Sequence, residues 1–356
     1  MIRVVTVEGA ARERGLQHGE QLREDIRRGV GRWLEVVATL GRPADDLLAE
    51  FLAAVDFAPA LARWAPDFLD EIDGLATAAG LPRSTLLAYN LGDEMWLWAY
   101  KSGYGEMVKS EPAARCTAIA TRPPATDRPL VAQTLDIPVS YCDTEVVLHV
   151  RDGEHPDLFT LTPAGMLSVI GCNELGVAVC GNTVMPLNHA RVGVPVVAVF
   201  RAILQQRSAA EAADLVRRIP HASGQNYLIC DPDEIIDLEC SATKVVEHAA
   251  GATILAHTNH PLSNDDVDDE LMQVEEPESA RRQAFMDAHL SEIAGAADVE
   301  RLLADRTVPI CKVGTDMAES TTWASMVVEP ARPPRMWIAV GPPSQNPFEE
   351  VDLPAA

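Results

Sequence analysis

The hydrophobic pattern of the chain changes once, near residue 115, and this change constrains the fold more than any single motif. Before it, apolar residues recur at steps of three and four along one helix face: Leu22, Ile26, Val30, Trp33 and Val37. Further helices are expected over residues 44–55, 66–79 and 82–99, each with a proline near its start, where a missing N–H is tolerated. Residues 1–115 are therefore predicted to form a helical segment.

After residue 115 the chain consists mainly of short runs typical of β-strands. The first are CTAIATR, PLVAQTLDI, TEVVLHVR, LFTLTPAG and SVIGCNELGVAVCGN, the last of which contains a turn. Helices near 195–206 and 208–218 separate these from a second set, and helices near 278–290 and 297–304 precede the final pair. Strand runs separated by helix pairs predict two antiparallel sheets with helices outside, an α+β fold. We expect 1–115 and 116–356 to form one globular unit.

The composition narrows the classes of partner. The 356 residues carry 29 basic and 53 acidic side chains, a net charge of −24, which repels nucleic acids and anionic membranes. No stretch approaches the ~18 consecutive apolar residues of a spanning helix, and the N-terminus lacks the apolar region of a signal peptide. Seven cysteines without CxxC spacing argue against structural zinc and a disulfide framework. We expect a cytoplasmic protein without metal or cofactor.

The charge is unevenly distributed, with −5 in residues 1–115 and −19 in residues 116–356. Eight acidic residues fall between Asp265 and Glu278 with no basic residue among them. Like charges this close do not pack against one another, so a solvated, mobile loop is expected. A lid or a weak cation site is the alternative, although the run lacks the glycine and ligand spacing of a calcium loop.

Cys116 begins the first β-run, directly after a polar stretch that has the character of an exposed linker. If the peptide bond between Arg115 and Cys116 were cut, the thiol and a new α-amine would share one residue. An α-amine titrates at about 7.7–8.0, so this nucleophile would carry its own base. Position alone also allows an inert strand cysteine, which is what we expect of the other six.

Seven segments in order carry a resemblance over nearly the whole chain: EGAARERGLQHGEQLREDI, RCTAIA, VAQTLDI, GCNELGVAVCGNTV, NYLICDPDEIIDLE, HTNH and TTWASMVVEP. Together they resemble the acyl-CoA:6-aminopenicillanic acid acyltransferase family, autoproteolytic N-terminal nucleophile (Ntn) hydrolases related to choloylglycine hydrolases. The resemblance implies a four-layer αββα sandwich preceded by the helical segment. It also implies self-cleavage before Cys116 into associated α (1–115) and β (116–356) chains, and acyl transfer or amide hydrolysis through a cysteinyl thioester.

The same resemblance assigns roles to single residues. Cys116 matches the nucleophile, Asp136 the aspartate of the next strand, and Asn259 the asparagine that supports the reacting carbonyl. These types suit the chemistry, because a carboxylate can hold an α-ammonium and an amide can donate to an oxyanion. All three are also ordinary strand-end or turn residues. The weaker candidates for an oxyanion or supporting role are Asn182, Thr117, His260 and Ser325.

His257 and His260 form an HxxH pair. Side chains three positions apart on a strand point to opposite faces, so we do not expect them to share a metal.

The sequence departs from the family pattern at several positions, and these changes bear on the choice of substrate. Arg115 stands where glycine is usual, Thr134 replaces the asparagine of the GQNxD strand, and CKVG (311–314) replaces cysteine, arginine and histidine. The arginine that relatives use near a substrate carboxylate has no clear counterpart. We expect hydrolysis of a small N-acyl amide rather than synthesis from acyl-CoA, because no phosphate-binding loop is present. An unprocessed thiol hydrolase and a non-catalytic acidic binding protein on the same fold are the alternatives, and a homo-oligomer is compatible with either.

Overall fold

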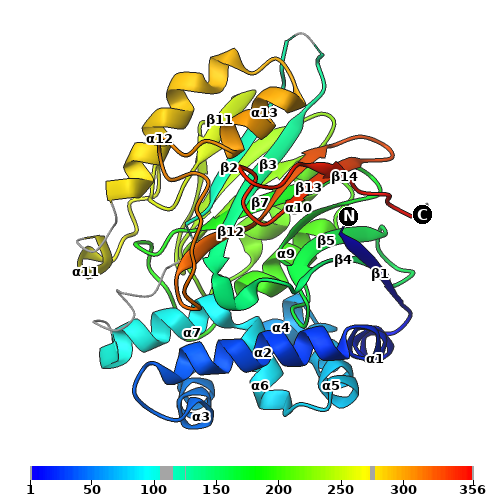
Figure 1. The fold of residues 1–356 in the computed structure, drawn as a ribbon, viewed down its shortest axis with the longest axis vertical. Helices are drawn as coiled ribbons and strands as arrows, with labels where there is room; N and C mark the ends of the chain where they lie inside the picture. The colour runs from blue at the N-terminus through cyan, green and yellow to red at the C-terminus, as the bar shows by residue number, and fades with distance from the viewer. Residues whose placement is uncertain (1, 105–114, 125, 273–276, 355–356) are drawn as a thin grey trace.

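The protein is described by a computed structural model, which covers residues 2–104, 115–124, 126–272 and 277–354. Two β-sheets lie face to face between outer helices, so the predicted four-layer αββα sandwich is confirmed (Figure 1). A large apolar core fills the space between the sheets and continues into the N-terminal helices. In the described part of the chain, no helix is both long and apolar enough to cross a membrane.

The first sheet has eight strands among the described residues. In spatial order they are β1 (Arg3–Glu8), β4 (Glu145–Arg151), β5 (Leu158–Pro163), β6 (Ile170–Asn173), β7 (Ala178–Thr183), β8 (Gln225–Cys230), β9 (Ile235–Cys240) and β10 (Val245–His248). The strands β4 to β10 pair antiparallel, whereas β1 pairs parallel with β4. Parallel pairing requires a long connection, which here contains the whole N-terminal helical segment.

The second sheet, with six described strands, is antiparallel throughout. Its spatial order is β11 (Ile254–His257), β2 (Thr117–Thr121), β3 (Leu130–Pro138), β12 (Ser320–Glu329), β13 (Arg335–Val340) and β14 (Glu349–Glu350). The central strands β2, β3 and β12 are almost entirely buried, because the other sheet covers one face and helices cover the other.

The helices fall into three groups. Those on the outer face of the first sheet are α9 (Val196–Leu204) and α10 (Ala209–Arg218), and those on the second sheet are α12 (Pro277–His289) and α13 (Ala296–Leu303). The N-terminal group gathers at one end of the sheets (Figure 1) and comprises α1 (Ala11–Gln21), α2 (Arg23–Ala38), α3 (Ala44–Ala54), α4 (Ala58–Trp64), α5 (Phe68–Ala79), α6 (Arg83–Asn90) and α7 (Gly92–Ala99).

The N-terminal segment differs in three places from the sequence-based expectation, the first being helix α4, which lies in none of the ranges expected to be helical. Strand β1 was not predicted, since its alternating pattern is short and its partner strand lies about 140 residues later. The single helix expected over 82–99 is two helices, α6 and α7, because the backbone leaves helical geometry at Leu91 (φ −111°, ψ 31°). This division matters for function, because residues of α7 line the cavity described below.

Two glycines allow helices α1 and α5 to pack with their backbones in contact. A Cβ at Gly15 would lie 2.0 Å from the carbonyl oxygen of Glu71, and a Cβ at Gly74 would lie 2.1 Å from that of Arg12. Next to this contact, the carboxylate of Glu71 forms buried ion pairs with Arg14 and Arg201. The arrangement attaches the N-terminal helices to α9 and hence to the first sheet.

The acidic segment 265–278 differs from the solvated loop that its charge predicted. The carboxylates of its first part have partners from other segments: Asp265 with Lys244, Asp266 with Ser241 and Thr243, and Asp268 with Lys101. The short helix α11 (Asp269–Met272) follows, and its Leu271 is buried against the cavity described below. Residues 273–276 lie outside the described residues.

Candidate active site

Cys116 lies directly before β2, and its side chain is only 2% exposed. In the antiparallel pairing of β2 with β3, the N–H of Arg115 donates to the carbonyl oxygen of Asp136 (3.1 Å). On the other side of β2, β11 pairs antiparallel as far as Ala118 opposite His257, and Asn259 follows two residues after that pair. The sheet register thus brings together the three residues assigned as catalytic.

The pKa values of the Cys116 thiol and of the Asp136 carboxyl group are both raised. Burial, and then the negative charge of Asp136, raises the pKa of Cys116 to about 12. Burial also raises the pKa of Asp136 to about 7, against the opposing effects of the Thr322 hydrogen bond and the positive charges of Lys312, Arg282 and Arg115. A carboxylate that titrates near neutrality can accept a proton at physiological pH.

Only one of the two carboxylate oxygens of Asp136 has a hydrogen-bond partner among the described residues. Its Oδ1 accepts a hydrogen bond of 2.6 Å from Thr322 Oγ1, whereas Oδ2 is buried and has no hydrogen-bond partner among the described residues. Burying a carboxylate oxygen without a hydrogen-bond partner costs free energy. Such an oxygen therefore marks a site that takes up a proton or accepts a hydrogen bond from a further donor.

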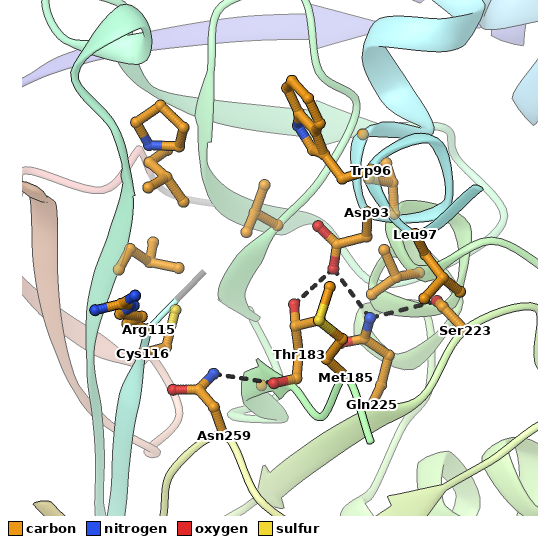
Figure 2. Close-up of a pocket in the computed structure, with 18 of the residues that line it drawn as sticks. Asp93, Trp96, Leu97, Arg115, Cys116, Thr183, Met185, Ser223, Gln225 and Asn259 are labelled. Carbon is orange, nitrogen blue, oxygen red and sulfur yellow. Dashed lines mark hydrogen bonds between the residues drawn. The ribbon is translucent and has the colours of Figure 1, made fainter. Parts of the chain in front are cut away.

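The amide group of Asn259 is held in one orientation. Its Oδ1 accepts from Arg282 Nη2 (2.8 Å), and its Nδ2 donates to the carbonyl oxygen of Thr183 (3.0 Å). One amide hydrogen is therefore left for a further acceptor. Figure 2 shows the amide beside Cys116 at the edge of the cavity.

Arg282 on α12 links these residues, and the sequence analysis missed it. Its Nη1 donates to the carbonyl oxygen of Cys116 (2.6 Å) and to Thr117 Oγ1 (2.9 Å), in addition to the bond from Nη2 to Asn259. The side chain is fully buried, and burial lowers its pKa while the charges of Asp136 and Cys116 oppose that effect. Nothing in the helical pattern of residues 278–290 distinguishes this arginine from neighbouring Arg281.

The CKVG departure contributes a further cation. Lys312 Nζ lies 3.2 Å from Glu278 Oε2, and Glu278 also pairs with Arg115 (3.0 Å). Lys312 stabilises the charged form of Asp136 as well. Glu278, the last residue of the acidic segment, therefore links Arg115 to this lysine.

The remaining sequence candidates occupy supporting positions. Asn182 does not line the cavity, and its Nδ2 donates to Asn226 Oδ1 and to the carbonyl oxygen of His257, both at 3.1 Å, which leaves no amide hydrogen for an oxyanion. The buried hydroxyl of Ser325, on β12, also lies away from the cavity and has no hydrogen-bond partner among the described residues. Thr117 contacts Arg282 rather than substrate space.

His260 and His257 hold the loop that carries Asn259. His260 Nδ1 lies 2.9 Å from Ser279 Oγ, which also accepts from the Asn259 N–H (2.9 Å). His257 Nε2 lies 2.8 Å from Glu239, whose carboxylate also accepts from three successive backbone N–H groups, those of residues 262–264. The two rings therefore have separate partners, and no cluster able to hold a metal ion was found in the described part of the chain.

A cavity of about 410 Å³ opens beside Cys116. Most of its wall is apolar and comes from α7, the end of β3, the segment after β7, and α9; it includes Trp96, Leu97, Ile137, Met166, Met185 and Phe200. Polar groups gather at two places (Figure 2), one around Cys116 and Asn259 and one around Asp93. A cavity of this size and character accommodates a small ligand with an apolar body.

Known proteins resemble the chain in sequence and in fold. Residues 124–345 match the family described as acyl-coenzyme A:6-aminopenicillanic acid acyl-transferase. The acyl-coenzyme A:6-aminopenicillanic-acid-acyltransferase 40 kDa form of Emericella nidulans is 24% identical over 262 residues, which are 73% of this chain and 70% of that protein.

Two solved structures illustrate the fold comparison. A variant of conjugated bile acid hydrolase from Clostridium perfringens aligns with a TM-score of 0.48 and 12% identity, covering 67% of this chain and 92% of that one. The Caenorhabditis elegans ortholog of N-acylethanolamine-hydrolyzing acid amidase aligns with a TM-score of 0.42 and 16% identity, covering 60% and 93%. Since the family match extends over more than half of the sequence and includes Asp136 and Asn259, the chain belongs to the acyl-coenzyme A:6-aminopenicillanic acid acyl-transferase family.

Proposed function

We propose that the chain is an autoproteolytic Ntn-type amidohydrolase that cleaves a small N-acyl amide through a thioester on Cys116. The observation that carries the proposal is a buried thiol and an oriented amide donor at one end of an apolar cavity, with a carboxylate of pKa about 7 near the thiol, behind the cavity wall. An acyl group matches both the apolar wall and the chemistry named for the family.

The first reaction is self-cleavage. Asp136 accepts the thiol proton as Sγ attacks the carbonyl carbon of Arg115, and the proton then passes to the Cys116 nitrogen as the C–N bond breaks. A thioester joins Arg115 to Cys116 Sγ until water hydrolyses it, which leaves a carboxylate on Arg115 and a free thiol and amine on Cys116. Because the thiol pKa is about 12 in the uncut chain, the proton transfer accompanies the attack rather than preceding it.

The second reaction is turnover. The new α-amine of Cys116 accepts the thiol proton, and Sγ attacks the amide carbonyl of the substrate. The remaining hydrogen of Asn259 Nδ2 donates to the oxyanion that forms. The proton then goes to the departing amine, and water hydrolyses the thioester. Transfer of the acyl group to an amine would use the same intermediate, with the amine in place of water.

Cleavage and acylation are tested on the same protein. We expect denaturing electrophoresis and N-terminal sequencing to show fragments 1–115 and 116–356, the larger beginning Cys-Thr-Ala, and a Cys116→Ala variant to stay intact. Intact-mass analysis with a panel of N-acyl amides should show the larger fragment gaining the mass of one acyl group. Cys142→Ala is the control, since Cys142 is also a free cysteine but does not line the cavity.

The outcomes separate the alternatives. An uncut chain that still forms the acyl-enzyme would overturn self-cleavage and leave an unprocessed thiol hydrolase. A chain that is neither cut nor acylated would leave the acidic binding protein.

A further inference from the structure

One charged side chain in the cavity has no role in the reaction proposed above. Asp93, in the first turn of α7, is the only acidic residue among the described residues that line the cavity. Its Oδ2 accepts hydrogen bonds from Thr183 Oγ1 (2.6 Å) and Gln225 Nε2 (3.0 Å). Figure 2 shows Asp93 across the cavity from Cys116, with its second carboxylate oxygen directed into the open space.

The local structure does not account for this carboxylate. It makes no capping hydrogen bond at the start of α7, and among the described residues it forms no ion pair. Both donors to it, Thr183 and Gln225, are neutral. Asp93 is half-buried at the cavity wall, and a carboxylate makes a stronger hydrogen bond with a cationic donor than with a neutral one.

The neighbouring acid, Glu94, has a different and structural task. Its Oε1 accepts from the Val196 N–H (2.9 Å) and from Ser223 Oγ (2.8 Å), so it fixes the first turn of α9. Burial, and next the charge of Asp93, raises the pKa of Glu94 to about 7. Glu94 does not line the cavity, so Asp93 alone presents negative charge to a ligand.

The charge distribution along the cavity favours one orientation of substrate. Arg115 and Arg282 line the end that holds Cys116, whereas Asp93 lines the opposite side. Leu271 of the acidic segment forms part of the wall, and the negative field of that segment draws cations towards it. A ligand carboxylate at the end remote from Cys116 would lie close to Asp93, and the two negative charges would repel each other.

We propose that Asp93 binds a cationic, ammonium-type group of the substrate, separated from the scissile carbonyl by an apolar chain. The inference rests on the proposed function, because it assumes that the reacting carbonyl lies at Cys116. Asp93 acts as a specificity-determining residue: its free oxygen accepts a charge-assisted hydrogen bond, while Thr183 and Gln225 hold the other.

The test compares three chromogenic anilides whose acyl chains have equal length and end in an ammonium, a methyl or a carboxylate group. We expect wild type to prefer the ammonium over the methyl substrate by about tenfold or more in kcat/KM, as for a hydrogen bond to a charged group. Asp93→Asn should bring that ratio close to one. Asp269→Asn, which removes one exposed charge from α11, is the matched control and should keep the wild-type ratio.

A binding measurement keeps the two proposals distinguishable. Hexylamine, hexanol and hexanoate are titrated into Cys116→Ala protein, with and without Asp93→Asn, and affinity is followed by calorimetry. Selective, Asp93-dependent binding of hexylamine without acylation of the wild type would support the cation subsite and overturn the amidohydrolase. Acylation at equal rates by all three substrates, unchanged in Asp93→Asn, would overturn the subsite and leave the amidohydrolase in place.

Discussion

The guanidinium of Arg282 donates a 2.8 Å hydrogen bond to Oδ1 of Asn259, and this contact fixes the orientation of the amide group. An asparagine amide can flip, and only its nitrogen can stabilise an oxyanion. The same guanidinium holds the carbonyl oxygen of Cys116 (2.6 Å). Arg282 therefore holds Cys116 and Asn259 in a fixed relative position, and in the proposed reaction it would act as a positioning residue.

Arg282→Lys keeps the charge but cannot span the three acceptors, so we expect kcat to fall while KM changes little. Asn259→Ala alone should lower kcat by about 10²–10³, the usual loss for one oxyanion donor. If the main effect of Arg282 is to orient Asn259, the double variant should be little worse than Asn259→Ala alone. Steady-state kinetics of the four proteins check this, and fully multiplicative losses would show that the arginine acts independently of the asparagine.

Self-cleavage should depend on the ionisation of Asp136. A base works in its deprotonated form, and the pKa of Asp136 is about 7, so the cleavage rate should rise as pH increases from 5 to 8 and then level off. Asp136→Asn should remain uncut. Precursor made by cell-free synthesis and sampled over time on denaturing gels gives the rates. A pH-independent rate, or normal cleavage of the asparagine variant, contradicts the assignment.

The same pKa predicts how stability changes with pH. The pKa of Asp136 is higher in the folded state than in the unfolded state, where it is about 3.9. Between these two pKa values the folded protein therefore binds one more proton than the unfolded protein. Its contribution to the free energy of unfolding is present below pH 4 and is lost as pH rises through about 7.

We therefore expect Asp136→Asn, in an uncut Cys116→Ala background, to gain stability relative to its parent as pH rises from 5 to 8, by up to about 3 kcal/mol. Urea unfolding of both proteins at the two pH values measures the gain. Glu94 and Glu145, whose pKa values are also raised to about 7, are present in both proteins and cancel in the difference. A gain that is equal at both pH values would show that Asp136 has an ordinary pKa.

The sequence singled out Cys116, Asp136 and Asn259 as candidates because each lies in a short local motif next to a strand. It missed Arg282 and Asp93 because their roles arise only from folding: Arg282 contacts Cys116 across 166 residues of sequence, and Asp93 contacts Thr183 across 90. Both stand in helices whose periodicity indicates the buried face but carries no information about which polar residue meets a strand end.

The fold could be predicted to a similar extent. The hydrophobic periodicity of residues 116–340 indicates the strands and the helix pairs, because each segment is long enough for its period to be recognised. The strand β1 depends on its partner β4, and the two helices α6 and α7 depend on the backbone geometry at Leu91, neither of which a local pattern specifies. Strand β1, with α1 packed beside it, connects the N-terminal segment to the sandwich.

The packing of α1 on α5 gives the last prediction. A methyl group at position 15 would overlap the carbonyl oxygen of Glu71, a backbone atom that cannot move alone. Gly15→Ala should therefore separate the helices and destabilise the protein by about 1–3 kcal/mol or more. Gly31→Ala, at a position of α2 where an added Cβ meets nothing within 4 Å, is the matched control and should be neutral or stabilising by up to about 1 kcal/mol. Thermal unfolding of both variants in the Cys116→Ala background provides the comparison, and equal melting temperatures would show that α1 and α5 are not in backbone contact.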